Sequence, residues 1–424
     1  MPDVVTVFLQ HGGEMLLLRR SDAGATFQGL WDGISGPETG DPRAAAEREL
    51  REVVGVDDAE RRRSGDPLRV VDDETGREWT IHPFLYDAPE RKVYPIDGIA
   101  DWEWVSPDAI LDRPCAPRLW STYRRVGPTV ADVAEDEERG AADISVTALA
   151  VLRDAAAEAS HVDAVADPDV QGCEAVHDVA RRLRDARPEM AVVVNRINRA
   201  MATADGLDEL AERARGTLRA ALNADDRAAM EAAEVLADEA EESPTVVTHS
   251  RSGTALAALR EADAAVVVGE SRTAREGVTV AAVLADTGHE VTLTTDAALP
   301  SAVSGDVGPT PDAALVGADA VLPDGDVVNK VGTRALGLAC RYAGLPLYVV
   351  AARDKIAVED REPTESAEPA ELYDGDDVAV ANPVFDRTPA DCIAAVITEH
   401  GRLDDEALQQ TVRDHREHAG WDEQ

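Results

Sequence analysis

Lysine is nearly absent from this sequence, and positive charge as a whole is scarce. Only Lys92, Lys330 and Lys355 are lysines among 42 basic residues, whereas 83 residues are acidic, so the formal net charge is −41 over 424 residues. Proteins that bind the phosphate backbone of nucleic acids need a basic surface. The charge therefore excludes direct nucleic-acid binding as the main activity. Molar salt screens the repulsion among so many carboxylates, and we therefore expect a halophilic source.

Other absences limit the fold and the location. Aromatic residues make up 4% of the sequence against 44% hydrophobic residues, so the cores must consist mainly of Val, Leu and Ala. Four scattered cysteines form no CxxC pair, which excludes a zinc ribbon and a disulfide framework. The start of the chain has no basic leader region, and no apolar run approaches the ~20 residues of a membrane span. We expect a soluble, cytoplasmic protein that does not contact membranes.

The pattern of residues divides the sequence into four parts. Residues 1–125 combine short apolar strands with one helical stretch, which predicts an α+β domain. Residues 126–142 start near a Gly-Pro pair and are polar and charged, as in a linker. Residues 143–243 have helical periodicity and predict a helical subdomain. Residues 244–412 alternate apolar runs with helical stretches, which predicts an α/β domain.

The last part has the features of a parallel sheet with helices on both faces. Its apolar runs are unbroken, as in strands that are buried on both sides. They are Val246–Val247, Ala264–Val268, Val291–Leu293, Ala313–Val316 and Leu347–Val350. Polar residues follow the runs, at the strand ends where such sheets bind ligands. We therefore expect a ligand site built from 248–251, 269–272, Asp296 and 317–319.

A first candidate site lies in residues 36–56, GPETGDPRAAAERELREVVGV. Glutamates three or four residues apart share one face of a helix, where they can hold Mg²⁺ against a diphosphate. The stretch resembles the Nudix box, with Arg48, Glu49, Glu52 and Gly55 at matching positions. Asp41 corresponds to an earlier acid of the box. The resemblance implies a Nudix-like fold for residues 1–125 and a Mg²⁺ site on Asp41, Glu49 and Glu52.

The box departs from the family pattern at two points. Val53 occupies the position of the last glutamate, and the segment from Asp41 to Arg48 is one residue short. A valine cannot bind a metal, so the ligand set is incomplete. The alternative is that Glu49 and Glu52 form a solvated helix face in a very acidic protein.

A second candidate site lies in the α/β part. Four motifs there are THSRSG (248–253), ESRTAREG (270–277), GADAVLPDGDVVNKVGT (317–333) and NPVFDRTPADCIAAVITEHG (382–401). Together they resemble the superfamily of the translation initiation factor 2B alpha, beta and delta subunits, ribose-1,5-bisphosphate isomerase and methylthioribose-1-phosphate isomerase. The resemblance covers residues 143–410 and implies a Rossmann-like α/β domain with a parallel sheet.

Lysine is used sparingly, and two of the three lysines lie in this second part. A compact ammonium group suits a phosphate, so Lys330 and Lys355 are candidates, with surface ion pairs as the alternative. In the isomerases, the residues at the positions of Asn329 and Lys330 contact substrate phosphate. The predicted binding residues are Arg251, Gly253, Arg272, Asn329 and Lys330, although either arginine could instead be an ion-pair partner.

The proton-transfer residues are only partly retained. The isomerases pair a cysteine with the aspartate of the GAD motif, and here Asp319 is present but Ser250 replaces the cysteine. A thiol can be tuned into a proton-transfer group, whereas an alcohol needs an adjacent base. The Thr-His-Ser sequence instead resembles the initiation-factor branch. Ser250 could be an ordinary loop serine and Asp319 a structural cap.

These observations leave three hypotheses. The one that the sequence favours is an initiation-factor-2B-like sensor or regulator that binds a sugar phosphate or nucleotide and carries a degenerate Nudix domain. The others are an aldose–ketose isomerase using Ser250 and Asp319, and a Mg²⁺-dependent Nudix hydrolase of nucleoside diphosphate derivatives. The resemblance implies a homo-oligomer, with initiation factor 2 or related subunits as partners in the initiation-factor branch. The second module requires no cofactor under any of the three.

Overall fold

The computed structural model describes residues 3–21, 27–71, 76, 78–137, 139–163, 171–202, 204, 206–375 and 377–423. The chain forms two compact units. Unit 1 contains 1–135, 147–182 and 204–219, and unit 2 contains 136–146, 183–203 and 220–424. No helix among the described residues combines the length and the apolar character that crossing a membrane requires.

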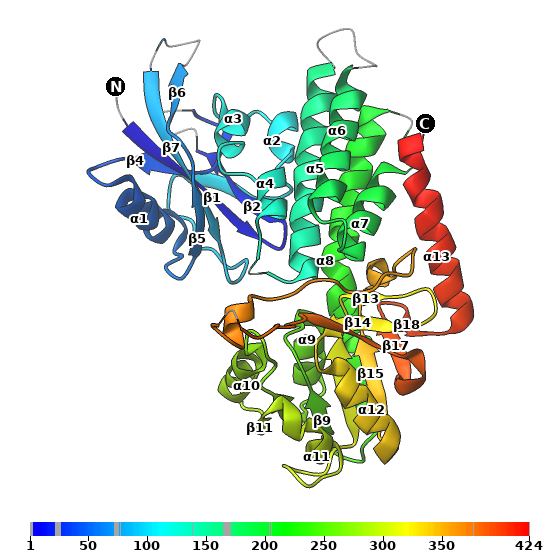
Figure 1. Cartoon of the computed structure of the whole chain (residues 1–424). Helices are drawn as coiled ribbons and strands as arrows, with labels where there is room; N and C mark the ends of the chain where they lie inside the picture. Colours follow the sequence, from blue (N-terminus) through cyan, green and yellow to red (C-terminus); the bar gives the residue numbers. More distant parts are fainter. Residues whose placement is uncertain are drawn as a thin grey trace. The chain divides into compact units, whose positions relative to one another are not determined.

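Unit 1 is built on a mixed eight-stranded sheet (Figure 1). Its central path runs β3-β2-β1-β7-β5, with β4 on β1, β6 on β7 and β8 on β2. Only β1 and β7 pair in parallel; all the other pairs are antiparallel. The strands are β1 (Asp3–His11), β2 (Glu14–Arg20), β3 (Trp31–Asp32), β4 (Ile34–Pro37), β5 (Glu60–Ser64), β6 (Leu68–Val71), β7 (Glu78–Asp87) and β8 (Ile99–Val105).

Helix α1 (Pro42–Val54) covers one face of this sheet, and local chemistry sets both of its ends. The Asp41 carboxylate accepts a hydrogen bond from the Ala44 amide at 3.1 Å, and Pro42 occupies the first turn, where no amide hydrogen is needed. Gly55 ends the helix at φ 72°, which favours glycine. Ala45, Leu50 and other apolar residues pack against the strands. The helix predicted from the sequence is therefore present.

The opposite face of the sheet packs against short helices. These are α2 (Ala109–Asp112) and α3 (Leu119–Tyr123), whose Ile110, Leu119 and Tyr123 contact Phe8 and Leu17 of the strands. Residues 126–142, predicted as a linker, include helix α4 (Val130–Ala134), which begins with a capping box between Thr129 and Asp132.

Four helices occupy most of the described residues between 141 and 237. They are α5 (Ala141–Asp163), α6 (Gln171–Ala186), α7 (Ala191–Met201) and α8 (Leu207–Ala237). The two units divide these residues between them, so that α7 and the second half of α8 belong to unit 2. Within unit 1, the buried Arg153 of α5 binds Asp154 at 2.7 Å, and Arg215 of α8 binds the buried Asp108 at 2.6 Å.

Unit 2 contains a seven-stranded sheet of order β11-β10-β9-β12-β15-β17-β18. The first six strands are parallel, and β18 pairs antiparallel with β17, so the sheet is mixed at this edge. The strands are β9 (Thr245–Thr248), β10 (Ala265–Gly269), β11 (Val291–Thr294), β12 (Ala313–Gly317), β15 (Leu347–Val350), β17 (Ala395–Thr398) and β18 (Gly401–Leu403). A smaller antiparallel sheet comprises β13 (Ala320–Val321), β14 (Val327–Lys330) and β16 (Phe385–Thr388).

Both faces of the large sheet are covered by helices. One core joins the strands to the end of α8, to α9 (Gly253–Glu261) and to α10 (Glu276–Asp286). The other joins them to α11 (Leu299–Val303), α12 (Thr333–Ala343) and α13 (Asp405–Ala419). Short 3₁₀ turns complete the chain: η1 (Asp296–Ala298), η2 (Arg353–Lys355), η3 (Pro369–Glu371), η4 (Ala390–Cys392) and η5 (Gly420–Glu423). Burial on both faces explains why the strands are unbroken apolar runs.

Candidate functional site

The strand order of unit 2 reverses at one position and so defines a candidate crevice beyond the strand ends. From β9 the chain continues to β10 and β11 on one side, whereas β12 and β15 extend from the other side of β9. Open α/β sheets bind ligands at such a reversal, beyond the carboxyl ends of the two neighbouring strands. Ser250 follows β9 by two residues and Asp319 follows β12 by two residues. The sheet thus places the two predicted proton-transfer residues at the same edge.

Ser250 is buried and held in a specific conformation. Its backbone is left-handed at φ 70°, and its amide donates to the Ser271 hydroxyl at 2.7 Å. Ser271, fully buried after β10, is also left-handed, at φ 59°. The Ser250 hydroxyl donates to the Glu276 carboxylate at 3.2 Å. Glu276 has no role predicted from the sequence, yet it supplies the adjacent carboxylate that an alcohol needs for proton transfer.

Glu276 also binds the predicted phosphate lysine. The Lys330 ammonium, at the end of β14, lies 3.5 Å from the Glu276 carboxylate, and both side chains are mostly buried. The same ammonium lies 5.3 Å from the centre of the Phe385 ring on β16. Lys330 is therefore directed into the crevice by its partners, and a phosphate there would have to share it with Glu276.

Asp319 is shielded from water and lies within the influence of both lysines. Loss of contact with water raises its pKa above the ordinary carboxyl value, and Glu276 adds to the rise. Lys355 and Lys330 act in the opposite direction and do not cancel the effect. Lys355 is buried, and its ammonium donates to the Ala318 carbonyl at 2.6 Å. Asp319 therefore keeps its proton to a higher pH than a solvated aspartate does.

A third carboxylate, the exposed Glu365, interacts electrostatically with these groups. Desolvation raises the pKa of Glu365, while Lys330 lowers it and the Asp319 charge raises it. The charges of Glu276, Asp319 and Glu365 therefore oppose those of Lys330 and Lys355. A dianionic phosphate is better tolerated here when Asp319 or Glu365 carries a proton.

The other predicted binding residues are placed differently from one another. Asn329 is buried, and its amide donates to the Thr333 hydroxyl at 3.0 Å. Arg251 and Arg272 are exposed at the ends of β9 and β10, respectively. Gly253 opens α9, and no atom lies within 4 Å of the position that a side chain would occupy there. Of the predicted set, Ser250 and Lys330 share the partner Glu276, and Asp319 responds to the charges of Lys330 and Glu276.

His249 connects several of the loops that follow the strands. Its ring is buried, with one nitrogen 2.8 Å from the Val331 carbonyl and the other 3.5 Å from the Asp296 carboxylate. Asp296 in turn accepts from the amides of Ser271 and Arg272 at 2.7 and 2.8 Å. These bonds tie together the loops after β9, β10, β11 and β14 and orient Ser250 and Lys330.

The Nudix box of unit 1 has its acids in different environments. Asp41 caps α1, Glu52 is exposed, and Glu49 is buried with its carboxylate 3.1 Å from Arg48. A side chain at Gly36 would come within 2.0 Å of the Glu49 carboxyl carbon, so this carboxylate lies against the loop before the helix. Val53 packs against the apolar core. Among the described residues no three side chains of the metal-binding types His, Cys, Asp or Glu converge.

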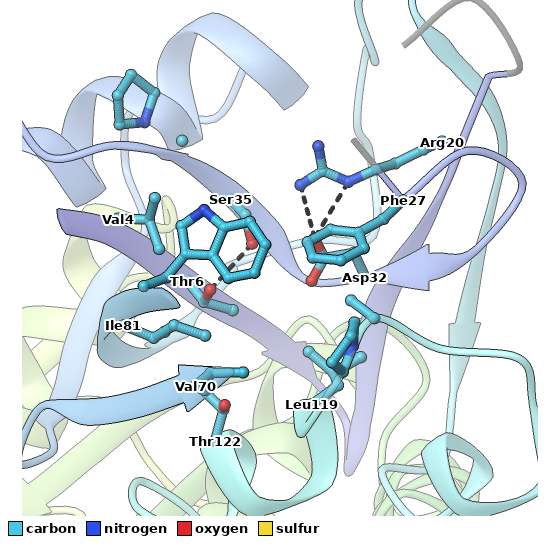
Figure 2. Close-up of a pocket in the computed structure, with 15 residues that line it drawn as sticks. Val4, Thr6, Arg20, Phe27, Asp32, Ser35, Val70, Ile81, Leu119 and Thr122 are labelled. Atoms are coloured by element: carbon cyan, nitrogen blue, oxygen red, sulfur yellow. Dashed lines mark hydrogen bonds and ion pairs between the residues drawn. The ribbon is translucent and has the colours of Figure 1, made fainter. Parts of the chain in front are cut away.

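A cavity of about 270 Å³ lies on the face of the unit 1 sheet opposite α1 (Figure 2). Phe27 and Trp79 stand at its mouth with ring centres 5.4 Å apart. Arg20 binds Asp32 at 2.6 Å on one wall, and the Thr6 and Ser35 hydroxyls lie 3.0 Å apart on another (Figure 2). Flat aromatic surfaces beside paired donors and acceptors suit a planar heteroaromatic ring.

Family comparison matches two segments of the chain. Residues 137–405 match the Initiation factor 2 subunit family, and residues 1–126 match the NUDIX domain. The chain belongs to the Initiation factor 2 subunit family. It combines that family's domain with an N-terminal NUDIX domain, and the resemblance inferred from the motifs is confirmed.

Individual relatives lie in the isomerase branch of this superfamily. The chain is 31% identical over 312 residues to a ribose 1,5-bisphosphate isomerase of Haloferax volcanii, an alignment covering 69% of this chain and 93% of that protein. It is 43% identical over 105 residues to a methylthioribose-1-phosphate isomerase of Alkalilimnicola ehrlichii, covering 22% of this chain and 30% of the relative.

Solved structures from the initiation-factor branch also match this chain. A crystal structure of translation initiation factor eIF-2B from Pyrococcus horikoshii matches with a TM-score of 0.53 and 26% identity, covering 65% of this chain and 94% of that one. The tetrameric eIF2B-beta2-delta2 complex of C. thermophilum matches with a TM-score of 0.51 at 17% identity, which supports the fold alone.

Proposed function

We propose that unit 2 binds a phosphorylated sugar in the crevice between β9 and β12 and interconverts its aldose and ketose forms. The observation that carries this proposal is the pair of carboxyl groups there. Asp319 has a raised pKa, whereas Glu276 is ion-paired with Lys330 and accepts a hydrogen bond from Ser250. Two carboxyl groups in contrasting environments are a recurring basis for acid–base chemistry.

In a ribose phosphate whose C1 oxygen carries phosphate, isomerisation breaks the bond between C1 and the ring oxygen, moves a hydrogen from C2 to C1, and transfers the proton of the C2 hydroxyl to the former ring oxygen, which leaves a ketone at C2. Asp319 serves as one proton-transfer group, and Glu276 with its bonded Ser250 serves as the other. The sequence alone favours a sensor because Ser250 is an alcohol without an evident base. The Glu276 carboxylate at 3.2 Å removes that objection, and we therefore place the isomerase first.

The substrate class follows from the lysines and from the relatives. Lys330 and Lys355 lie in the crevice of a chain with only one other lysine. Relatives aligned over nine-tenths of their own length are ribose 1,5-bisphosphate isomerases. We accordingly propose a ribose phosphate as substrate, in a halophilic, cytoplasmic protein that acts as a homo-oligomer. If the crevice binds this ligand without turnover, the protein is a sensor, with initiation factor 2 or related subunits as the partners to test.

Turnover can be followed directly. The purified full-length protein in molar KCl is incubated with ribose 1,5-bisphosphate, and ³¹P and ¹³C NMR spectra record the appearance of a ketose phosphate. Conversion by the protein and none in its absence is the expected result. An unchanged spectrum at high protein concentration, with binding demonstrated separately, would contradict the isomerase and favour the sensor.

A second candidate function concerns unit 1, because its cavity has features that a structural domain does not need. We propose that the cavity between Phe27, Trp79 and the Arg20–Asp32 pair binds the base of a nucleotide. The aromatic rings supply stacking surface, and the ion pair presents donors and acceptors to the edge of the ring. Whether a diphosphate is then cleaved depends on the incomplete Nudix box.

Replacing Trp79 by Ala tests this second function. Stacking on an aromatic side chain contributes about 1–3 kcal/mol per base, so Trp79→Ala should weaken binding of ADP or GDP by about tenfold in a fluorescence titration. Trp102→Ala is the matched control, because Trp102 is exposed on β8 and does not line the cavity. Equal affinities in the two variants would place the nucleotide elsewhere.

A further inference from the structure

A second cavity of unit 1 is lined by residues of α1 other than the Nudix glutamates Glu49 and Glu52. It measures about 220 Å³ and lies between α1, the loop after it, β5 and β7. Arg43, Arg51 and Arg61 line it together with Glu47, Asp57 and Tyr86. Three guanidinium groups around one small cavity are unexpected in a chain of net charge −41.

Among the described residues, two of these arginines differ from their neighbours in having no ion-pair partner. On β5, Arg62 pairs with Asp87 and Arg63 with Asp132. On α1, Arg43 binds Glu47 at 2.9 Å and Arg48 binds Glu49 at 3.1 Å. Within the part of the chain that the structure describes, the guanidinium groups of Arg51 and Arg61 have no ion-pair partner, and both line the same cavity.

A buried hydroxyl group in the wall of this cavity also lacks a partner. Tyr86 on β7 is 2% exposed, and its OH makes no hydrogen bond to any described residue. Arg61 is the cross-strand partner of Tyr86. Burial raises the pKa of Tyr86 and Glu47 adds to the rise, whereas Arg61 and Arg43 lower it. An unsatisfied buried polar group destabilises the fold, so a bound ligand that supplies an acceptor to the Tyr86 hydroxyl would remove this unfavourable contribution.

We infer that this cavity binds a phosphate group. An oxyanion would accept hydrogen bonds from the Tyr86 hydroxyl and charge-assisted bonds from Arg51 and Arg61, whose planar guanidinium groups match phosphate geometry. Glu47 is already bound by Arg43, which leaves Asp57 as the one lining carboxylate without that neutralisation. The cavity is smaller than those that hold drug-sized ligands, so the ligand is inorganic phosphate or a small phosphate ester. This site is separate from the unit 2 crevice and does not depend on its proposed activity.

The probe is inorganic phosphate, titrated calorimetrically into full-length protein in KCl of constant ionic strength. The parent protein carries Lys330→Ala, so that the crevice of unit 2 does not contribute its phosphate lysine. We expect saturable binding to this parent, weakened at least tenfold by Arg51→Gln with Arg61→Gln. Both arginines are exposed, so their replacement should leave the fold intact.

Two further variants separate the site from general electrostatics. Arg62→Gln removes the same charge from the same strand and should change the affinity less than twofold. Tyr86→Phe should weaken phosphate binding severalfold while leaving unfolding stability equal or higher, because the hydroxyl has no partner without the ligand. Absence of phosphate binding to the parent, or equal affinity in the parent and the double variant, would overturn the inference.

Discussion

Replacing Asp319 by Asn is expected to abolish isomerisation while phosphate binding is retained. A positioned proton-transfer group contributes about 10²–10⁴ in rate, so turnover should fall by roughly a thousandfold or to background in the NMR assay. Asparagine preserves the size of the side chain but has no carboxyl group that could accept and release a proton at the raised pKa of Asp319. Loss of a negative charge beside Lys330 and Lys355 should leave sugar-phosphate affinity equal or tighter.

The direction of the affinity change separates this role from a structural one. If Asp319 merely capped the loop after β12, its replacement would weaken binding and lower Tm together. Asp386→Asn is a suitable control, because Asp386 accepts from the Gly332 and Arg334 amides at the start of α12 and has no assigned proton-transfer role. Retained turnover in Asp319→Asn would remove Asp319 from the mechanism.

The largest stability effect is expected at Asp354. This buried carboxylate binds Arg196 at 3.0 Å and Arg199 at 2.6 Å, and Arg196 itself is fully buried on α7. Removing one partner of a buried charge network costs about 3–5 kcal/mol because charge is left uncompensated. Asp354→Asn should therefore lower Tm by about 6–20 °C at the usual 2–4 °C per kcal/mol for a unit of this size.

The effect has a defined pH dependence. Arg199 and Arg196 hold the pKa of Asp354 below its ordinary value despite burial. The stabilisation is therefore fully present above the unfolded-state pKa of ~3.9 and is lost as the pH falls through the lower folded-state pKa. The difference between wild type and Asp354→Asn should shrink only in acid, and it should persist in molar KCl because buried pairs are weakly screened.

Asp414→Asn provides the control for this comparison. Asp414 is an exposed partner of Arg353 at 3.7 Å, and such pairs contribute about 0–1 kcal/mol. Calorimetric or circular-dichroism melts of the three proteins give the comparison. A Tm for Asp354→Asn within one or two degrees of the control would mean that the ion pairs of Asp354 with the α7 arginines do not stabilise the fold.

The framework of unit 2 was accessible from the sequence because burial on both faces leaves a simple signal. The run Ala313–Val316 lies in β12, as predicted. Strand β17 (Ala395–Thr398) was missed, since its short apolar run lies inside the NPVFD motif region. The small sheet β13-β14-β16 was missed because its strands have two to four residues.

The site was predictable only where a residue was rare or its motif specific. Lys330 stood out because lysine is nearly absent, and Ser250 and Asp319 stood out through their motifs. Glu276 lies inside the ESRTAREG motif, but its residue type did not indicate a role, and Glu365 is one of 83 acidic residues and carries no signal of its own. The inferred phosphate cavity of unit 1 could not be predicted either, because only the folded chain shows which arginines form ion pairs.

Ligand binding by wild-type protein and Lys330→Ala tests the central claim most directly. Thermal melts of both are recorded in molar KCl with ribose 1,5-bisphosphate and with ribose 5-phosphate. A ligand at a hundred times its Kd stabilises by about 2.7 kcal/mol, and we predict a clear rise in Tm for wild type that is lost in Lys330→Ala. An equal rise in both proteins, or none with either ligand, would contradict a sugar-phosphate site at the carboxyl ends of β9 and β12.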